Sequence, residues 1–180
     1  MIHPSTVLAG SLPVATAGLA RPVPTGALYS VLLLLHVGAA VVGFGAVSLT
    51  GVQAARARRG PAQPGAASIR RYFRPGVNWA GRILYAVPVL GFALVADSSG
   101  AFEAGDGFVV AGLLMWLAGA TLAEAVVWPA ERRIQAVVTE RWDDPAMRSV
   151  LERDCGFASA AAAVVAGIFV ASVVVMVGKP

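Results

Sequence analysis

The sequence is short of charged side chains. Only 13% of its 180 residues are Asp, Glu, Lys or Arg, whereas 57% are hydrophobic and the mean hydropathy is +0.72. Soluble domains carry charge on about a quarter of their residues, so this composition excludes an ordinary water-soluble fold. A helix that crosses a membrane needs roughly 20 apolar residues. The chain length therefore leaves room for four or five such helices and for no separate soluble domain.

Cysteine and histidine are also scarce. The one cysteine, Cys155, excludes a disulfide within the chain and a thiolate metal cluster. The two histidines, His3 and His36, do not combine with Ser and Asp into a catalytic triad, and there is no zinc-ligand spacing and no phosphate-binding Gly-rich loop. These absences favour a protein without conventional enzyme chemistry.

Basic residues are missing from the first 20 positions. A signal peptide begins with a basic segment, so residues 1–26, which contain four prolines, are predicted to form a flexible tail on the outer side of the membrane. A cleaved uncharged leader and a misassigned start codon are the alternatives for this segment.

Four long apolar stretches dominate the rest of the chain. They predict an all-α, polytopic membrane protein whose residues 27–178 form a bundle of four transmembrane helices. The third helix is expected to end at Pro129, because proline lacks an N–H and its ring clashes with the preceding turn. The predicted spans are residues 27–51, 78–96, 107–128 and 156–177.

Arginine collects in alternate connections between these spans. Residues 52–77 contain six arginines and no acid, and residues 130–154 contain five arginines, whereas residues 97–106 contain three acids and no base. Bases near the ends of a span mark the cytoplasmic side. Both termini are therefore predicted outside and both arginine-rich connections in the cytoplasm. The basic pI of about 10.0 reflects this orientation and does not indicate nucleic-acid binding.

The composition also predicts the membrane in which the protein resides. Arginine supplies thirteen of the fourteen bases, and Ala, Val and Gly are abundant. This composition is typical of a GC-rich bacterial genome and predicts a bacterial plasma-membrane protein, with the lipid bilayer as its first partner.

Residues 130–154 alternate apolar and charged side chains at helical spacing, which predicts amphipathic helices lying on the inner interface.

Arg82 and Glu124 lie within the second and third spans, each about five residues, or roughly 7 Å, from the cytoplasmic end. Charges in hydrocarbon are costly unless they pair or reach the surface, so the two are expected to form an ion pair. Trp116, Ala120, Glu124 and Trp128 follow one another at i+4 spacing, so the two indoles are expected to shield it. The pair is interpreted as a structural clamp. A proton or anion relay and an Arg82 that reaches lipid phosphate are the alternatives.

His36 and Met115 fall at about the same depth in the first and third spans. Imidazole and thioether groups can ligate haem iron or copper, so this pair is a candidate metal or haem site. The alternatives are a histidine that only packs and forms hydrogen bonds, and a site with two His36 side chains across a dimer.

Small residues recur at four-residue spacing, which lets membrane helices approach closely. The candidate packing positions are Gly43 in the first span and Ser159, Ala163 and Gly167 in the fourth. They could seal the bundle or contact another subunit, as in a homo-oligomer or a membrane complex.

Three segments carry a family resemblance: LLLLHVGAAVVGFGAV, GRILYAVPVLGFALV and VVWPAERRI. They resemble predicted bacterial four-helix integral membrane proteins of unknown function. The layout is also similar to copper-resistance D type proteins and to bacterial membrane protoporphyrinogen oxidases, which implies a haem-linked role for His36. This chain lacks the further intramembrane histidines or lysines that such chemistry uses.

The sequence therefore predicts an accessory or structural component of a membrane assembly. A small transporter or ion-handling protein that uses Arg82 and Glu124 is the first alternative. A haem-linked or redox protein that uses His36 is the second.

Overall fold

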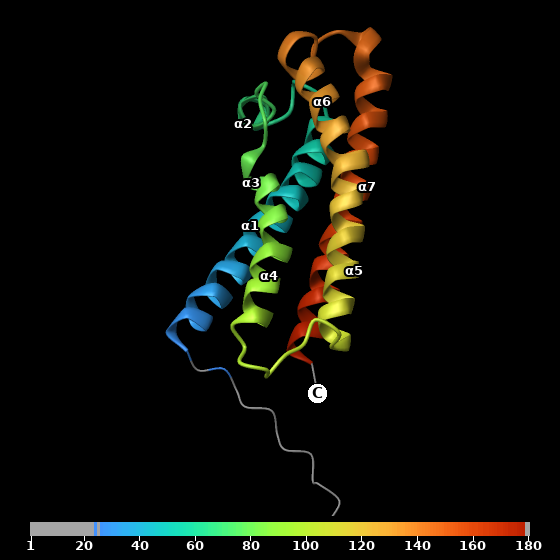
Figure 1. Ribbon diagram of the computed structural model, residues 1–180. Coiled ribbons are helices and arrows are strands. Elements are labelled where there is room, and N and C mark those ends of the chain that lie inside the picture. Colours follow the sequence, from blue (N-terminus) through green and yellow to red (C-terminus); the bar gives the residue numbers. More distant parts are fainter. Residues whose placement is uncertain (1–23, 25, 179–180) are drawn as a thin grey trace, which may run out of the picture.

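The structure is a computed structural model in which residues 24 and 26–178 are described. Nearly all of the predicted tail, including His3, and also Lys179 lie outside the described residues. Every regular element in the described part is helical (Figure 1). Four of its helical segments are long and apolar enough to cross a membrane.

The first and fourth of these segments each contain a long, uninterrupted α-helix. The second contains a 3₁₀ turn and the third contains a π turn. The elements are α1 (Ala27–Ala57), α2 (Ala66–Tyr72), α3 (Trp79–Arg82), a 3₁₀ turn (Ile83–Tyr85), α4 (Ala86–Ala96), α5 (Gly107–Leu122), a π turn (Ala123–Val127), α6 (Trp128–Glu140), a 3₁₀ turn (Pro145–Met147) and α7 (Arg148–Val177).

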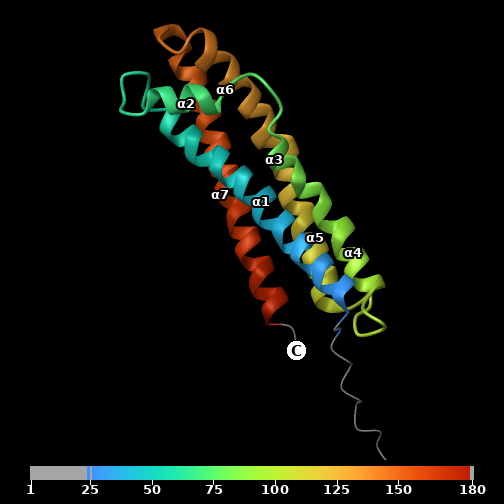
Figure 2. The ribbon, with the colours of Figure 1, turned by 90° about the vertical axis from the view of Figure 1, so that its left-hand side faces the viewer.

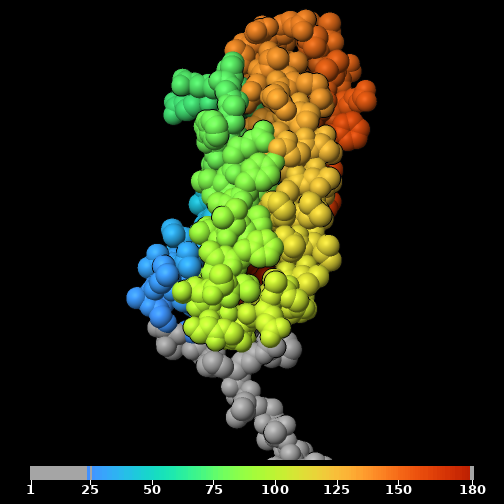
Figure 3. Space-filling view, in the orientation of Figure 1, coloured from blue at the N-terminus to red at the C-terminus, as the bar shows by residue number. Residues whose placement is uncertain are grey.

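The helical segments run alternately up and down. Figure 1 shows the start of α1, the connection between α4 and α5 and the end of α7 at one end of the molecule, with α2 and the connection between α6 and α7 at the other. We call the latter the arginine-rich end. Figure 2 shows that α1 and α7 cross and then diverge toward the opposite end. In Figure 3 a narrow hollow separates parts of α4 and α5, and dark red atoms of the C-terminal part of α7 are visible in it.

Glycines in α1 permit the closest helix contacts. A Cβ on Gly51 would overlap the Cβ of Ala162 in α7, and a Cβ on Gly43 would lie 2.6 Å from the backbone N of Leu84. No side chain fits at either position without a shift of the helices, because real Cβ atoms do not approach other heavy atoms so closely. These two glycines therefore set how α1 crosses α7 and the second span.

Two clusters of buried side chains hold the helices together. The middle cluster joins α1, the second and third spans and α7 through residues such as Phe44, Leu84 and Val165. The end cluster, at the arginine-rich end, joins α1, α2, α6 and α7 through residues such as Ile69 and Ile134. Burial of large apolar side chains stabilises each cluster by about 1.5–3 kcal/mol per side chain when the reference is water.

The third helix does not end at Pro129, as the sequence predicted. It continues through α6 to Glu140 because a π turn immediately precedes the proline. In that turn the N–H of Trp128 donates to the carbonyl of Ala123, five residues back. The wider turn makes room for the proline ring, and Pro129 stands at the start of α6, where its missing N–H is tolerated.

Residues 130–154 are amphipathic, but the apolar face of α6 packs against protein. Ile134 and Val138 are buried in the end cluster, with Trp142 and Leu151 from the segments that follow. The helix α7 begins at Arg148 and runs without interruption into the last span. The connection is therefore a helical hairpin that prolongs the third and fourth spans, and the expectation of separate helices lying on the interface is wrong.

Candidate functional site

The structure brings Arg82 and Glu124 together. Arg82 ends α3, Glu124 lies in the π turn, and Arg82 Nη1 is 2.9 Å from Glu124 Oε1. The side chains are 26% and 48% exposed, respectively. Both residues lie where a helix departs from α geometry, since a 3₁₀ turn directly follows Arg82. Single π turns inside helices occur frequently at functional sites.

Aromatic rings surround this ion pair. The Arg82 guanidinium carbon lies 3.5 Å from the centroid of the Trp128 ring, a cation–π contact. Tyr85 Oη donates a hydrogen bond to the same Glu124 oxygen that accepts from Arg82. The Tyr85 ring also lies 6.0 Å from Trp128 and 6.5 Å from Trp116, between ring centroids. Tyr85 was missed from the sequence, because a tyrosine in an apolar span is typical of packing.

A proline explains how Trp116 joins the second span. Pro88 has no N–H to donate to the carbonyl of Leu84, four residues back. Trp116 Nε1 donates to that carbonyl at 2.9 Å. The indole thus satisfies a backbone acceptor that the proline leaves open, and it fixes the third span against the second beside the ion pair.

A second polar cluster lies next to the ion pair and was missed from the sequence. Glu131 in α6 is 4% exposed, and Asn78 Nδ2 lies 3.4 Å from both Glu131 Oε1 and Thr50 Oγ1. Thr50 is fully buried and its hydroxyl is 2.6 Å from Tyr72 Oη. Burial raises the pKa of the Tyr72 phenol. We call Glu131, Asn78, Thr50 and Tyr72 the buried polar cluster.

The same asparagine connects the two groups. Asn78 Oδ1 accepts from the N–H of Gly81, the residue before Arg82, at 3.2 Å. This bond caps the start of α3. The Asn78 Nδ2 group donates to Thr50 and Glu131 in the buried polar cluster. Nothing in the sequence distinguishes Glu131 from a solvated acid, because arginines follow it directly in an arginine-rich connection.

His36 and Met115 have partners on different helices. His36 Nδ1 donates to the carbonyl of Val87 in α4 at 3.0 Å, and Gly91 leaves room for the imidazole ring. Met115 Sδ accepts from Ser172 Oγ in α7 at 3.3 Å. Each of the two predicted ligands thus contacts a different helix, and a haem or copper site between them stays a prediction. The described residues also contain no group of three His, Cys, Asp or Glu side chains placed to hold a metal.

The predicted packing positions separate into two sets. Gly43 makes the close contact with Leu84, and Ser159 Oγ donates to the carbonyl of Gly51 in α1 at 3.1 Å. Ala163 and Gly167 are exposed, and a Cβ on Gly167 would meet nothing within 4 Å. The small residues of α7 that seal the bundle are instead Ala158, Ala161 and Ala162, which are buried.

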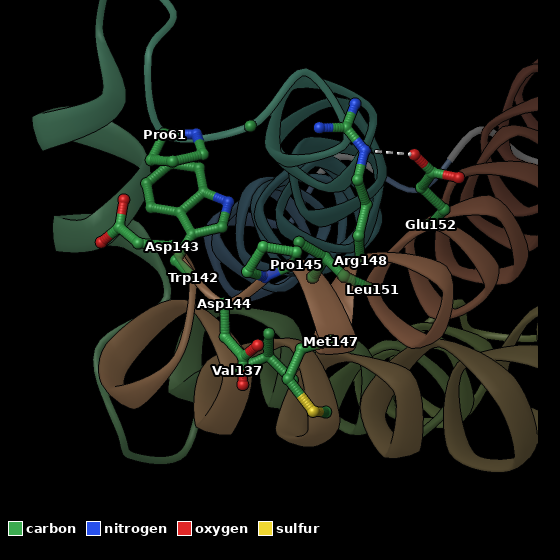
Figure 4. Close-up of a pocket in the computed structure, with 11 residues that line it drawn as sticks. Pro61, Val137, Trp142, Asp143, Asp144, Pro145, Met147, Arg148, Leu151 and Glu152 are labelled. Atoms are coloured by element: carbon green, nitrogen blue, oxygen red, sulfur yellow. Dashed lines mark hydrogen bonds and ion pairs between the residues drawn. The ribbon is translucent and has the colours of Figure 1, made fainter.

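A pocket with a volume of about 230 Å³ lies at the arginine-rich end, beside the connection between α6 and α7 (Figure 4). Trp142 and Pro61 form part of its wall, and Arg148 and Glu152 form an ion pair of 3.0 Å at its edge. Asp143, also in the wall, pairs with an arginine of α2. The charges around this pocket thus largely satisfy one another, and they do not define a ligand.

Comparison with protein-family models, with curated proteins and with solved structures finds no match for this chain. The described part of the chain is all-helical and has four segments suited to crossing a membrane. An ion pair surrounded by aromatic rings joins the second segment to the third.

Proposed function

We propose that this chain is a four-helix protein of the bacterial plasma membrane, and that it serves as an accessory or structural component of a larger membrane assembly. The termini face outside and the arginine-rich end faces the cytoplasm. The alternating course of the four segments in Figure 1 supports this threading, because it puts both arginine-rich connections at one end.

The exposed small-residue face of α7 is the observation that carries the proposal. Ala163, Gly167 and Ala171 follow one another at four-residue spacing, and all three are exposed. They do not seal this bundle, which leaves contact with another membrane helix as the use that their spacing favours. In a bilayer, close backbone approach along such a face drives helix association by van der Waals packing.

The ion pair fits a structural role in such a component. Glu124, the Trp128 ring and the neighbouring Tyr85 hold Arg82 between the second and third spans. A guanidinium with a carboxylate and a ring face as partners is compensated for the loss of water. The pair then holds the second span against the third.

The test is to block the exposed face. Gly167→Leu should abolish association and reduce the size of the species extracted from the membrane in mild detergent. Gly45→Leu is the matched control, since Gly45 is also an exposed helical glycine with nothing within 4 Å of its Cβ position. The two variants should unfold alike, because each replaces an exposed helical glycine with a better helix former. Equal assembly size for both variants would contradict the proposal.

Ion handling at Arg82 and Glu124 is a second candidate, favoured by the 48% exposure of the Glu124 side chain and by the π turn that contains it. In this case Glu124→Gln should abolish proton or anion flux in liposomes while the bundle stays folded. A structural clamp instead predicts reduced stability and no flux in the wild type.

A further inference from the structure

Glu131 is a buried carboxyl group that the proposed function does not use. It is 4% exposed, and no Lys or Arg nitrogen in the described part of the chain lies within 4.0 Å of its oxygens. Its only hydrogen bond to a described residue is the one from Asn78 Nδ2, at 3.4 Å. An ionised carboxylate removed from water needs several short hydrogen bonds or a close cation. The site therefore favours the neutral acid.

The neighbours of Glu131 are arranged for a group that exchanges protons. Asn78 places its amide between Glu131 and the Thr50 hydroxyl, which in turn contacts Tyr72 Oη. Asn78 Nδ2 can donate to Glu131 Oε1 in either protonation state of the acid, and the Thr50 and Tyr72 hydroxyls can each donate or accept. The charged and titratable groups that act on Glu131 are Tyr72 from α2, Arg82 from α3 and Arg132 from its own helix.

A vacant hydrogen-bond donor lies beside the cluster. Trp128 is 2% exposed, and its Nε1 has no hydrogen-bond partner among the residues that the structure describes. A Cβ built on Gly81 would lie 3.4 Å from this nitrogen and 3.8 Å from Asn78 Cγ. The missing side chain of Gly81 thus leaves space between the indole N–H and the amide that bonds Glu131. A buried N–H without a partner costs free energy, so the indole is a further polar group beside the buried polar cluster.

The residues that precede Asn78 are exposed. These are Gly76 and Val77, and the carbonyl of Gly76 accepts from Gln135 Nε2 at 3.3 Å. This segment lies at the arginine-rich end, within the six-arginine connection. The backbone that leads into Asn78 is therefore exposed on the side of the six-arginine connection.

We propose that Glu131 is a proton-binding site that opens to the arginine-rich end of the molecule. In binding, an O–H bond of a hydronium ion breaks and an O–H bond forms on the carboxylate, so the hydronium ion becomes a water molecule and one positive charge enters the site. The buried polar cluster holds the neutral acid through Asn78. This inference does not depend on the proposed role in an assembly, because it concerns the protonation of a single chain.

Infrared spectroscopy of the purified protein in sodium-free buffer at pH 7 tests it. The wild type should show the C=O band of a protonated carboxylic acid, which shifts in heavy water and disappears as the pH is raised. Glu131→Gln should lack this band and Glu152→Gln should keep it, since Glu152 is exposed and paired with Arg148. Absence of the band from the wild type, or its persistence in Glu131→Gln, would overturn the proposal.

Two further measurements keep the test decisive. Asn78→Ala retains the carboxyl group and removes its hydrogen-bond partner, so the band should shift in frequency even if Glu131→Gln fails to fold. An unshifted band in Asn78→Ala would mean that the acid lies elsewhere. Addition of sodium at constant pH should leave the wild-type band unchanged, and loss of the band would show that the site takes a metal cation instead of a proton.

Discussion

Replacing Gly43 with alanine should destabilise the bundle, although the same replacement two residues later should not. A Cβ on Gly43 would lie 2.6 Å from the backbone N and 2.8 Å from the Cα of Leu84, whereas a Cβ on Gly45 would meet nothing within 4 Å. Backbone atoms of a packed helix cannot move aside as a flexible side chain can. The added methyl group must therefore push α1 away from the second span.

The magnitude follows from two opposed terms. Alanine is favoured over glycine inside a helix by about 0.5–1 kcal/mol, and this gain applies to Gly43→Ala and Gly45→Ala alike. Overpacking of a tight contact costs about 1–3 kcal/mol, and only Gly43→Ala incurs it. The free energies of unfolding of the two variants should thus differ by about 1–3 kcal/mol.

Thermal unfolding of the two purified variants in the same detergent measures this difference. For chains of about 150–250 residues, 1 kcal/mol shifts the melting temperature by about 2–4 °C. Gly43→Ala is therefore expected to melt about 2–12 °C below Gly45→Ala. Equal melting temperatures would refute the close approach of α1 to Leu84 and the helix crossing that depends on it.

Two other substitutions probe the frame of the ion pair. Trp116→Phe should destabilise the protein by about 0.5–1.5 kcal/mol, because the carbonyl of Leu84 loses the bond from the indole N–H and keeps that from the N–H of Ala86; a melting temperature unchanged from the wild type would contradict the indole bond. Tyr85→Phe removes the hydroxyl that bonds Glu124 and should cost about 0.5–1.5 kcal/mol. In a background that already carries Glu124→Gln the Tyr85 effect should shrink, and an undiminished effect in this double-mutant cycle would count against the contact.

Much of the helical layout could be predicted from the sequence. The second span was expected at residues 78–96 and the structure has helix from Trp79 to Ala96, while the third was expected to begin at Gly107 and does so. Continuous apolar runs and flanking turn residues determine these boundaries. The equal depths of Arg82 and Glu124 also indicated that the two could meet.

The rest depended on geometry that a linear pattern does not contain. Pro129 is a sound helix terminator when the preceding turn is α-helical, and the π turn before it has no sequence signature. The small-residue spacing in α7 predicts packing positions at Ser159, Ala163 and Gly167, but it does not distinguish the side that packs on α1, which carries Ser159 and the buried Ala158 and Ala162, from the exposed side. Small residues are so frequent in this helix that several faces satisfy the same spacing.

The buried polar cluster was hidden for a related reason. Its members come from four separate segments, and each is ordinary in its own surroundings. Glu131 is buried only because α6 prolongs the third span and the segment before α3 covers it. A pattern of single residues gives no sign of an acid that becomes enclosed in this way.

The length of α7 has a consequence for how the molecule meets water. Its 30 residues extend over about 45 Å at 1.5 Å each, while the hydrocarbon layer is about 30 Å thick. With the proposed threading, roughly 15 Å of helix stands clear of the lipid tails. The end cluster then forms a small folded headpiece beyond the inner surface of the lipid, at the level where the sequence predicted amphipathic helices lying on the interface.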